Sequence, residues 1–284
     1  MVTLTDEEIR RHVQIALAED IGPGDATTLA TVPESRSASA VMAAREPLVV
    51  AGLALAEAAF AQLSSELVIT PSLTDGARAE RGQVLLRVQG PARAILTAER
   101  TALNFVQRLS GVATFTARFV EAVRDTHARI LDTRKTTPGW RRLEKYAVAC
   151  GGGQNHRVGL YDLVLIKDNH LMALRNELPN PIAAAVARAR ACYPQLQVEV
   201  EADTLEQVQQ AVDAGADIIL LDNMTAAQLR AAVALVAGRA KTEASGGIDL
   251  ASVCGVAETG VDFISVGAMT HSARAVDIGL DFEA

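Results

Sequence analysis

Three short polar segments hold most of the residues in this chain that could do chemistry. They are Asp132–Pro138, Cys150–Arg157 and Lys167–His170. The stretch from the first to the last has seven Lys and Arg against four Asp and Glu, although the formal net charge of the chain is -7. Arg presents a planar fork to a carboxylate or phosphate, and Lys presents a compact point charge. The sequence therefore predicts a cationic pocket for a small, highly charged anion.

The cations that we expect in this pocket come from all three segments. A run of three glycines, Gly151–Gly153, precedes His156 and Arg157, and such a run is costly unless the backbone bends sharply or approaches a ligand. A lone His is usually structural, but this one has Arg beside it and Lys167 nearby in the sequence. The candidate pocket residues are Arg134, Lys135, His156, Arg157 and Lys167.

Carboxylates stand at the ends of two expected strands. Glu199 and Glu201 are two residues apart, so both point to one face of a strand while Val198 and Val200 point to the other. Buried carboxylates need a cation or water. One interpretation is ion pairing with Arg or Lys inside a barrel. The other adds Asp222 at the next strand end and predicts a site for Mg2+ and substrate hydroxyls.

Glycines follow the last two expected strands, in Ser245-Gly246-Gly247 and at Gly267. Glycine lets backbone N–H groups come close to a phosphate, and barrels often bind phosphate after their last strands. Taken alone, Ser-Gly-Gly is equally an ordinary turn. Its place after the penultimate strand favours a phosphate site.

The composition excludes several classes of protein. With 284 residues, 49% hydrophobic and 21% charged, the chain can fold into one large or two modest domains with an aliphatic core. A pI near 5.3 argues against nucleic-acid binding. We find no apolar run long enough for a bilayer, no signal peptide, and three cysteines without metal-like spacing, so we expect a cytoplasmic protein. No Ser/His/Asp arrangement suggests covalent catalysis.

From about residue 115 the sequence alternates apolar strands and amphipathic helices. The predicted strands are 129–131, 163–166, 197–201, 217–221, 240–244 and 262–266, with helices at 205–214 and 225–237. Polar or Gly residues follow each strand, which is typical of an α/β barrel; an open Rossmann-like sheet would gather its site at one switch point. The segment is short for eight units, so we expect an irregular barrel with fewer strands.

The first hundred residues predict a mixed α/β unit. A helix is expected at 6–18 and strands at 38–44, 67–70 and 84–88. Thr97 is predicted to cap a helix that Gly111 ends. Arg100, on that helix, is ambiguous by itself.

These motifs together resemble the quinolinate phosphoribosyltransferase family, the decarboxylating nicotinate-nucleotide pyrophosphorylases. The resemblance covers almost the whole chain. Outside the three central segments, the residues that carry it are 18–28 (AEDIGPGDATT), 99–104 (ERTALN), 109–114 (LSGVAT), 220–223 (LLDN), 245–247 (SGG) and 266–272 (VGAMTHS).

The resemblance implies an N-terminal α/β sandwich domain at 1–114, an α/β barrel with the catalytic site at 115–272, and a tail at 273–284 that packs on the N-terminal domain. It also implies a homodimer, or a higher oligomer built from it, in which the N-terminal domain caps the partner's barrel. The implied reaction transfers phosphoribosyl from phosphoribosyl pyrophosphate to quinolinate, with loss of CO2. The implied cofactor is Mg2+.

The resemblance also assigns roles. Arg134, Lys135, His156, Arg157 and Lys167 would bind the quinolinate carboxylates with Thr133 alongside, and Arg100 would reach into the neighbouring subunit. Glu201 and Asp222 would hold the ribose and Mg2+, and Lys135, Lys167, Glu201 and Asp222 would be catalytic. Ser245, Gly246, Gly247 and Gly267 would cradle the 5′-phosphate. The alternatives are a nicotinate-using paralogue, a related molybdate-operon protein, and a non-catalytic phosphoribosyl or nucleotide sensor.

Overall fold

The computed structural model describes residues 2–283, which divide into two compact units. Unit 1 consists of residues 2–117, 137–152 and 272–283, and unit 2 of residues 118–136 and 153–271. Met1 and Ala284, the outer ends of the predicted N-terminal domain and tail, lie outside the described residues.

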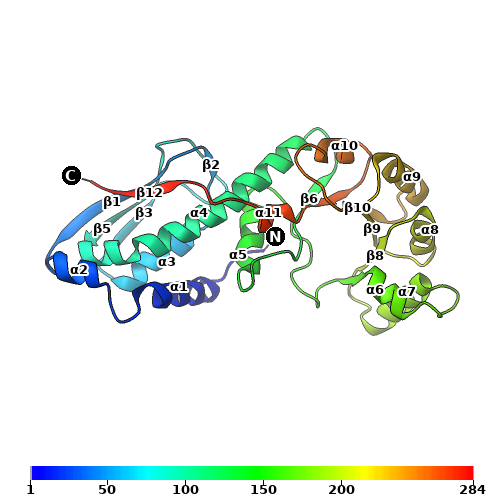
Figure 1. Ribbon diagram of the computed structural model, residues 1–284, viewed down its shortest axis with the longest axis horizontal. Coiled ribbons are helices and arrows are strands. Elements are labelled where there is room, and N and C mark those ends of the chain that lie inside the picture. Colours follow the sequence, from blue (N-terminus) through cyan, green and yellow to red (C-terminus); the bar gives the residue numbers. More distant parts are fainter. Residues whose placement is uncertain (1, 284) are drawn as a thin grey trace. The chain divides into compact units, whose positions relative to one another are not determined.

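Unit 1 is built on an antiparallel four-stranded sheet with the order β12-β1-β5-β3. Thr5 and Glu8 cap its first helix with reciprocal hydrogen bonds, a capping box. Figure 1 shows β12, the last strand of the chain, beside β1. The elements are α1 (Asp6–Ile21), α2 (Ala26–Thr31), β1 (Ser37–Ala44), β2 (Leu48–Val49), α3 (Leu53–Leu63), β3 (Val68–Pro71), β4 (Arg78–Ala79), β5 (Val84–Pro91), α4 (Ala92–Ala122, which continues into unit 2), α5 (Arg141–Cys150) and β12 (Ile278–Phe282).

The predicted Thr97–Gly111 helix is wrong at both ends. Helix α4 begins at Ala92 and passes through both residues. The Thr97 side chain donates to Asp25 Oδ2 at 3.0 Å instead of capping the helix. Gly111 does not end the helix but allows another part of the chain to approach it closely, because a Cβ there would lie 2.0 Å from the carbonyl oxygen of Arg274. The sequence alone does not distinguish a glycine that ends a helix from one that allows a close contact.

Unit 2 is a parallel sheet with helices between its strands. All six predicted strands are confirmed to within a residue or two at each end, as are the two predicted helices. Figure 1 shows helices α7 to α9 outside strands β8 to β10. The elements are β6 (Arg129–Leu131), β7 (Val164–Ile166), α6 (Asp168–Ala173), α7 (Pro181–Cys192), β8 (Val198–Ala202), α8 (Leu205–Asp213), β9 (Ile218–Asp222), α9 (Ala226–Val236), β10 (Lys241–Ser245), α10 (Val253–Ala257), β11 (Phe263–Ser265) and α11 (Ala268–His271).

The sheet of unit 2 has the order β6-β11-β10-β9-β8-β7. Its edge strands β6 and β7 do not pair with each other within residues 2–283, so the sheet is barrel-like but not closed. The predicted irregular barrel with fewer than eight strands is therefore confirmed. Parallel strands place all their carboxyl ends at one edge, and this edge carries the site.

The two compact units divide the chain differently from the predicted ranges. The predicted boundary after residue 114 falls inside α4, and residues 137–152 group with the N-terminal residues. Buried Glu144 ties this segment to unit 1, since it accepts from Arg108 Nη2 at 2.9 Å and from the backbone and side chain of Thr137. Over residues 2–283, no helix is both long and apolar enough to cross a bilayer.

Candidate active site

A pocket of about 440 Å3 opens at the carboxyl ends of the parallel strands in unit 2. It gathers side chains from strand ends and loops that are far apart in the sequence. The predicted residues that line it are Thr133, Arg134, Lys135, His156, Arg157, Lys167, Glu201, Asp222 and Ser245. Leu165, Leu220, Glu243 and Ser265 also line it and were not predicted.

The loop after β6 presents Thr133, Arg134 and Lys135 to the pocket. Thr133 Oγ1 accepts from the backbone N–H of Lys135 at 3.0 Å, which makes a tight local turn. The Lys135 carbonyl accepts from Thr270 Oγ1 at 2.7 Å. Both ends of the Lys135 peptide are therefore held, and its ammonium group projects from a fixed point.

Asp132 anchors the second cationic segment, although the sequence did not mark it as a site residue. Its buried carboxylate accepts from Asn155 Nδ2 at 2.7 Å and from the backbone N–H of His156 at 2.9 Å. Hydrogen bonds to a charged acceptor are stronger than neutral ones. Asp132 thereby fixes the backbone that carries His156 and Arg157.

Lys167, at the end of β7, forms an ion pair with Glu201, at the end of β8. Its Nζ lies 2.7 Å from Glu201 Oε2, and the side chains are 45% and 10% exposed. His170 Nδ1 accepts from the backbone N–H of Lys167 at 2.9 Å and fixes the start of α6. Arg134, Lys135 and Arg157 form what we call the cationic wall of the pocket, and Lys167 joins this wall to the carboxylates.

Glu201 and Asp222 end the neighbouring strands β8 and β9. Burial, and then the nearby Glu201 carboxylate, raise the pKa of Asp222, while a hydrogen bond from Ser245 opposes the shift. Asn223, in the left-handed region at φ 54°, donates from Nδ2 to Asp222 Oδ2 at 2.5 Å. Two close carboxylates that repel each other are a donor set that suits Mg2+.

The glycines next to the pocket have different reasons to be glycine. Gly246 has φ +102°, and a Cβ there would lie 2.2 Å from Asn223 Oδ1. At Gly267 a Cβ would lie 2.8 Å from Lys135 Cδ, so this glycine makes room for the lysine chain. By contrast, Gly151 belongs to unit 1, and a Cβ there would lie 2.3 Å from the carbonyl oxygen of Ala113, so its close approach is to helix α4. Gly247, at φ +59°, has open space around its Cβ position.

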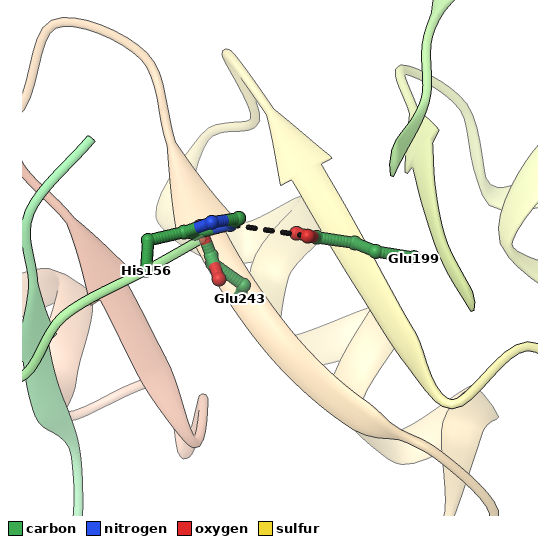
Figure 2. Close-up of side chains that lie close together, drawn as sticks. All are labelled: His156, Glu199 and Glu243. Carbon is green, nitrogen blue, oxygen red and sulfur yellow. Dashed lines mark ion pairs between the residues drawn. The ribbon is translucent and has the colours of Figure 1, made fainter. Parts of the chain in front are cut away.

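Glu199 lies deeper than Glu201 and does not line the pocket. Its Oε2 is 3.1 Å from His156 Nε2, and Glu243 Oε1 is 3.6 Å from the same nitrogen. Figure 2 shows the imidazole of His156 directed at the Glu199 carboxylate, with Glu243 beside it. Glu199 therefore faces the imidazole of His156, and not the Arg or Lys that the ion-pairing interpretation expected.

Arg100 does not line this pocket. It is exposed on α4 in unit 1, where it borders a different pocket of about 310 Å3 with Asp20, Asp25 and Thr97. Of the predicted site residues it is the one that the structure places in the other unit.

Glu243 is the ionisable lining residue that sequence reasoning missed. A signal was present, because Glu243 precedes Ser245 by two residues as Glu199 precedes Glu201. Strands β8 and β10 therefore each direct a glutamate, and two residues later a polar residue, toward the same face of the sheet.

Two sequence-family models match the chain. The quinolinate phosphoribosyl transferase N-terminal domain matches residues 25–110 and the C-terminal domain residues 112–281. The chain belongs to the quinolinate phosphoribosyltransferase family. The nicotinate-nucleotide pyrophosphorylase [carboxylating] of Mycobacterium leprae is 46% identical to it over 278 residues, covering 96% of each chain.

Other members of the family agree along almost the full length. A probable nicotinate-nucleotide pyrophosphorylase [carboxylating] of Bacillus subtilis is 43% identical, covering 96% of this chain and 93% of its own. The solved structure of the nicotinate-nucleotide pyrophosphorylase from Francisella tularensis superposes with a TM-score of 0.93 at 40% identity, covering 99% of this chain and 98% of its own. The expected fold and family are therefore confirmed.

Proposed function

We propose that this protein is a quinolinate phosphoribosyltransferase, a pentosyltransferase of de novo NAD biosynthesis. It joins quinolinate to the phosphoribosyl group of phosphoribosyl pyrophosphate and releases pyrophosphate and CO2, which leaves nicotinate mononucleotide. The observation that carries this proposal is one pocket, in a member of this family, that combines a cationic wall with a pair of strand-end carboxylates.

The cationic wall suits a dicarboxylate. Arg134 and Arg157 lie near enough for their charges to repel, since Arg134 lowers the pKa of Arg157, after the larger effect of burial. Two guanidinium groups held close together are stabilised by an anion between them, and each can bind a carboxylate through two hydrogen bonds. Lys135 and Lys167 add point charges beside them.

Glu201 and Asp222 are the residues that would hold Mg2+ and the ribose hydroxyls. When bound, Mg2+ supplies positive charge next to the pyrophosphate leaving group. The Asp222 carboxylate is held by Asn223, and Lys167 already neutralises part of the charge on Glu201. These carboxylates also lie where an oxocarbenium-like ribose would gain from nearby negative charge.

The chemistry has two steps. In the first, the pyridine nitrogen bonds to ribose C1 as the C1–O bond to pyrophosphate breaks, and the electron pair of that bond leaves with pyrophosphate. In the second, the C–CO2 bond next to the pyridinium nitrogen breaks, its electron pair stays on the ring carbon where the positive nitrogen stabilises it, and a proton then takes the place of CO2. The cations of the pocket would orient both carboxylates while the site excludes water from the developing charge.

Three finer points belong to the same proposal. The 5′-phosphate would be cradled by Ser245, Gly246, Gly247 and Gly267. The positive φ angles of Gly246 and Gly247 support this assignment, because turns of this kind can direct backbone N–H groups at an anion. Exposed Arg100 would complete the pocket of a second subunit in a homodimer. The three cysteines are free, which supports a cytoplasmic location.

A chromatographic assay with quinolinate, phosphoribosyl pyrophosphate and Mg2+ tests the proposal, with nicotinate in a parallel reaction. We expect nicotinate mononucleotide and CO2 from quinolinate alone. Product from nicotinate alone would place the protein with the nicotinate-using paralogues. Tight binding of phosphoribosyl pyrophosphate without any product would indicate a sensor.

A further inference from the structure

Two buried carboxylates, one that lines the pocket and one that lies deeper, share one imidazole. Glu199 from β8 is 0% exposed and Glu243 from β10 is 1% exposed, while the His156 side chain is 9% exposed. We refer to these three residues as the floor cluster. None of the four carboxylate oxygens has a hydrogen-bond partner of good geometry among the described residues, although the Ser265 hydroxyl lies close enough to Glu243 to lower its pKa. Buried charge of this kind is costly, so the cluster has to bind something positive.

The hydrogen bonds of His156 indicate how the imidazole is protonated. The backbone N–H of Arg157 donates to Nδ1 at 2.7 Å, so Nδ1 is an acceptor. In a neutral imidazole the other nitrogen, Nε2, then carries the hydrogen, and this nitrogen faces both glutamates. One N–H cannot satisfy two ionised carboxylates.

Apart from His156, the groups with the largest effect on the Glu243 carboxylate bring no positive charge. Strand β9 places Leu220 opposite it, β11 contributes the Ser265 hydroxyl, and the segment after β6 contributes the negative Asp132. With Glu199 and His156, Ser265 and Asp132 are the side chains that affect the Glu243 carboxylate most. The cations Arg134, Lys135, Arg157 and Lys167 line the same pocket. Glu199 has a better partner for its charge, since it also acts favourably on the Arg157 guanidinium.

We propose that Glu243 sets the charge of the substrate pocket: it holds a proton while a dicarboxylate is bound, and its ionisation weakens that binding. This inference rests on the proposed function. Burial, and then the Glu199 charge, raise the pKa of Glu243 to about 8, against the smaller opposing effects of His156 and Ser265. Glu243 lines the pocket, so a second negative charge on the floor would face the bound dianion.

A divalent metal is the other cation that three such side chains could hold. Their ligand atoms lie within 4.8 Å of one another. However, a histidine that binds a metal needs a free electron pair on the binding nitrogen and usually donates from the other one. Here the other nitrogen accepts from Arg157, so the geometry favours a proton over a metal.

Calorimetry on the wild-type protein tests the proton directly. Quinolinate is titrated at pH 6.5 and pH 9 in buffers with different ionisation enthalpies. Because the pKa of Glu243 is raised in the free protein, we expect proton uptake on binding that is larger at pH 9 than at pH 6.5, where Glu243 is already protonated. The dissociation constant should rise toward about tenfold per pH unit above pH 8. Absence of proton uptake at pH 9 would refute the proposal.

Glu243→Gln identifies the group. Glutamine has the shape of a protonated glutamate and cannot ionise, so the dissociation constant for quinolinate should no longer rise between pH 7 and pH 9.5. Glu206→Gln is the matched control, since Glu206 is an exposed residue of α8 in the same unit. This variant should keep the wild-type pH dependence. A dissociation constant that still rises with pH as in wild type, in folded Glu243→Gln protein, would overturn the assignment.

Two further outcomes are decisive. Stoichiometric metal in the purified wild-type protein that is lost in Glu243→Gln would replace the proton by a metal site. If wild-type protein does not bind quinolinate at pH 7, the proposed function fails. The proton on Glu243 is then tested without substrate, by carbon-13 NMR of labelled glutamate carboxyls across pH 6 to 10; titration near the ordinary glutamate pKa would refute it.

Discussion

Gly267 offers a sharp test of how the pocket is built, because a single methyl group there should act on one side chain of the pocket, that of Lys135. A Cβ at this position would lie 2.8 Å from Lys135 Cδ and 3.4 Å from the ring of His271. Gly267 has no positive φ, so alanine can adopt its backbone conformation without strain. The Gly267→Ala substitution therefore perturbs packing against Lys135 more than the fold.

The geometry sets the size of the effect. Carbon atoms in contact lie about 3.5 Å apart or more, so the Lys135 chain has to move by about 0.7 Å. Its backbone cannot follow easily, since Thr133 and Thr270 hold both ends of the peptide. Misplacement of a reacting group by about 1 Å costs roughly a hundredfold in rate. We expect kcat/KM to fall about tenfold to a hundredfold, with a loss of about 1–2 kcal/mol in the free energy of unfolding.

Steady-state kinetics and urea denaturation check this, with Gly255→Ala in α10 as the control, because its Cβ position has nothing within 4 Å. We also compare Lys135→Ala with the Lys135→Ala/Gly267→Ala double variant, which should have the same activity if the methyl group acts through the lysine. Wild-type activity in Gly267→Ala, or losses that multiply in the double variant, would refute the reasoning.

Three other substitutions test separate parts of the structure. Lys167→Ala removes the ammonium group 2.7 Å from Glu201. Turnover should fall about a hundredfold or more, while the urea midpoint of unfolding stays the same as in wild type. Near-normal kinetics would show that Lys167 is not part of the site. If Arg100 completes the partner's pocket, mixing inactive Arg100→Ala and Lys167→Ala proteins should restore part of the activity, and no recovery after verified subunit exchange would argue for a site within one chain. Asp132→Asn exchanges one acceptor oxygen for a donor beside the two N–H groups of Asn155 and His156. We therefore expect quinolinate KM to rise about tenfold and the free energy of unfolding to fall by about 1–3 kcal/mol. An unchanged KM would show that the His156 backbone does not depend on this carboxylate.

The sequence was sufficient for the strands of unit 2 and for most of the pocket. Apolar runs such as Val198–Ala202 and Ile218–Asp222 are local signals, and a polar residue at each strand end follows directly in the chain. Because parallel strands place these ends at one edge, eight of the nine predicted lining residues could be assigned to one pocket before any contact was known, and Thr133 was added only by the family resemblance. Local pattern and a general rule of topology were enough.

Other features depend on partners that are distant in the chain. Gly111 is glycine because residue 274 lies against α4, and Asp132 is a site residue because it holds Asn155 and His156. Neither relation leaves a mark on neighbouring residues.

The charge state of Glu243 is the clearest case of what tertiary structure alone decides. In the sequence it is one more acidic residue on a strand. In the fold, burial and the nearby Glu199 carboxylate make its ionisation unfavourable. The amino-acid sequence determined which side chains reach the edge of the sheet, whereas the protonation of those side chains depends on distances across three strands, since electrostatic energy is set by separation in space and by access to water.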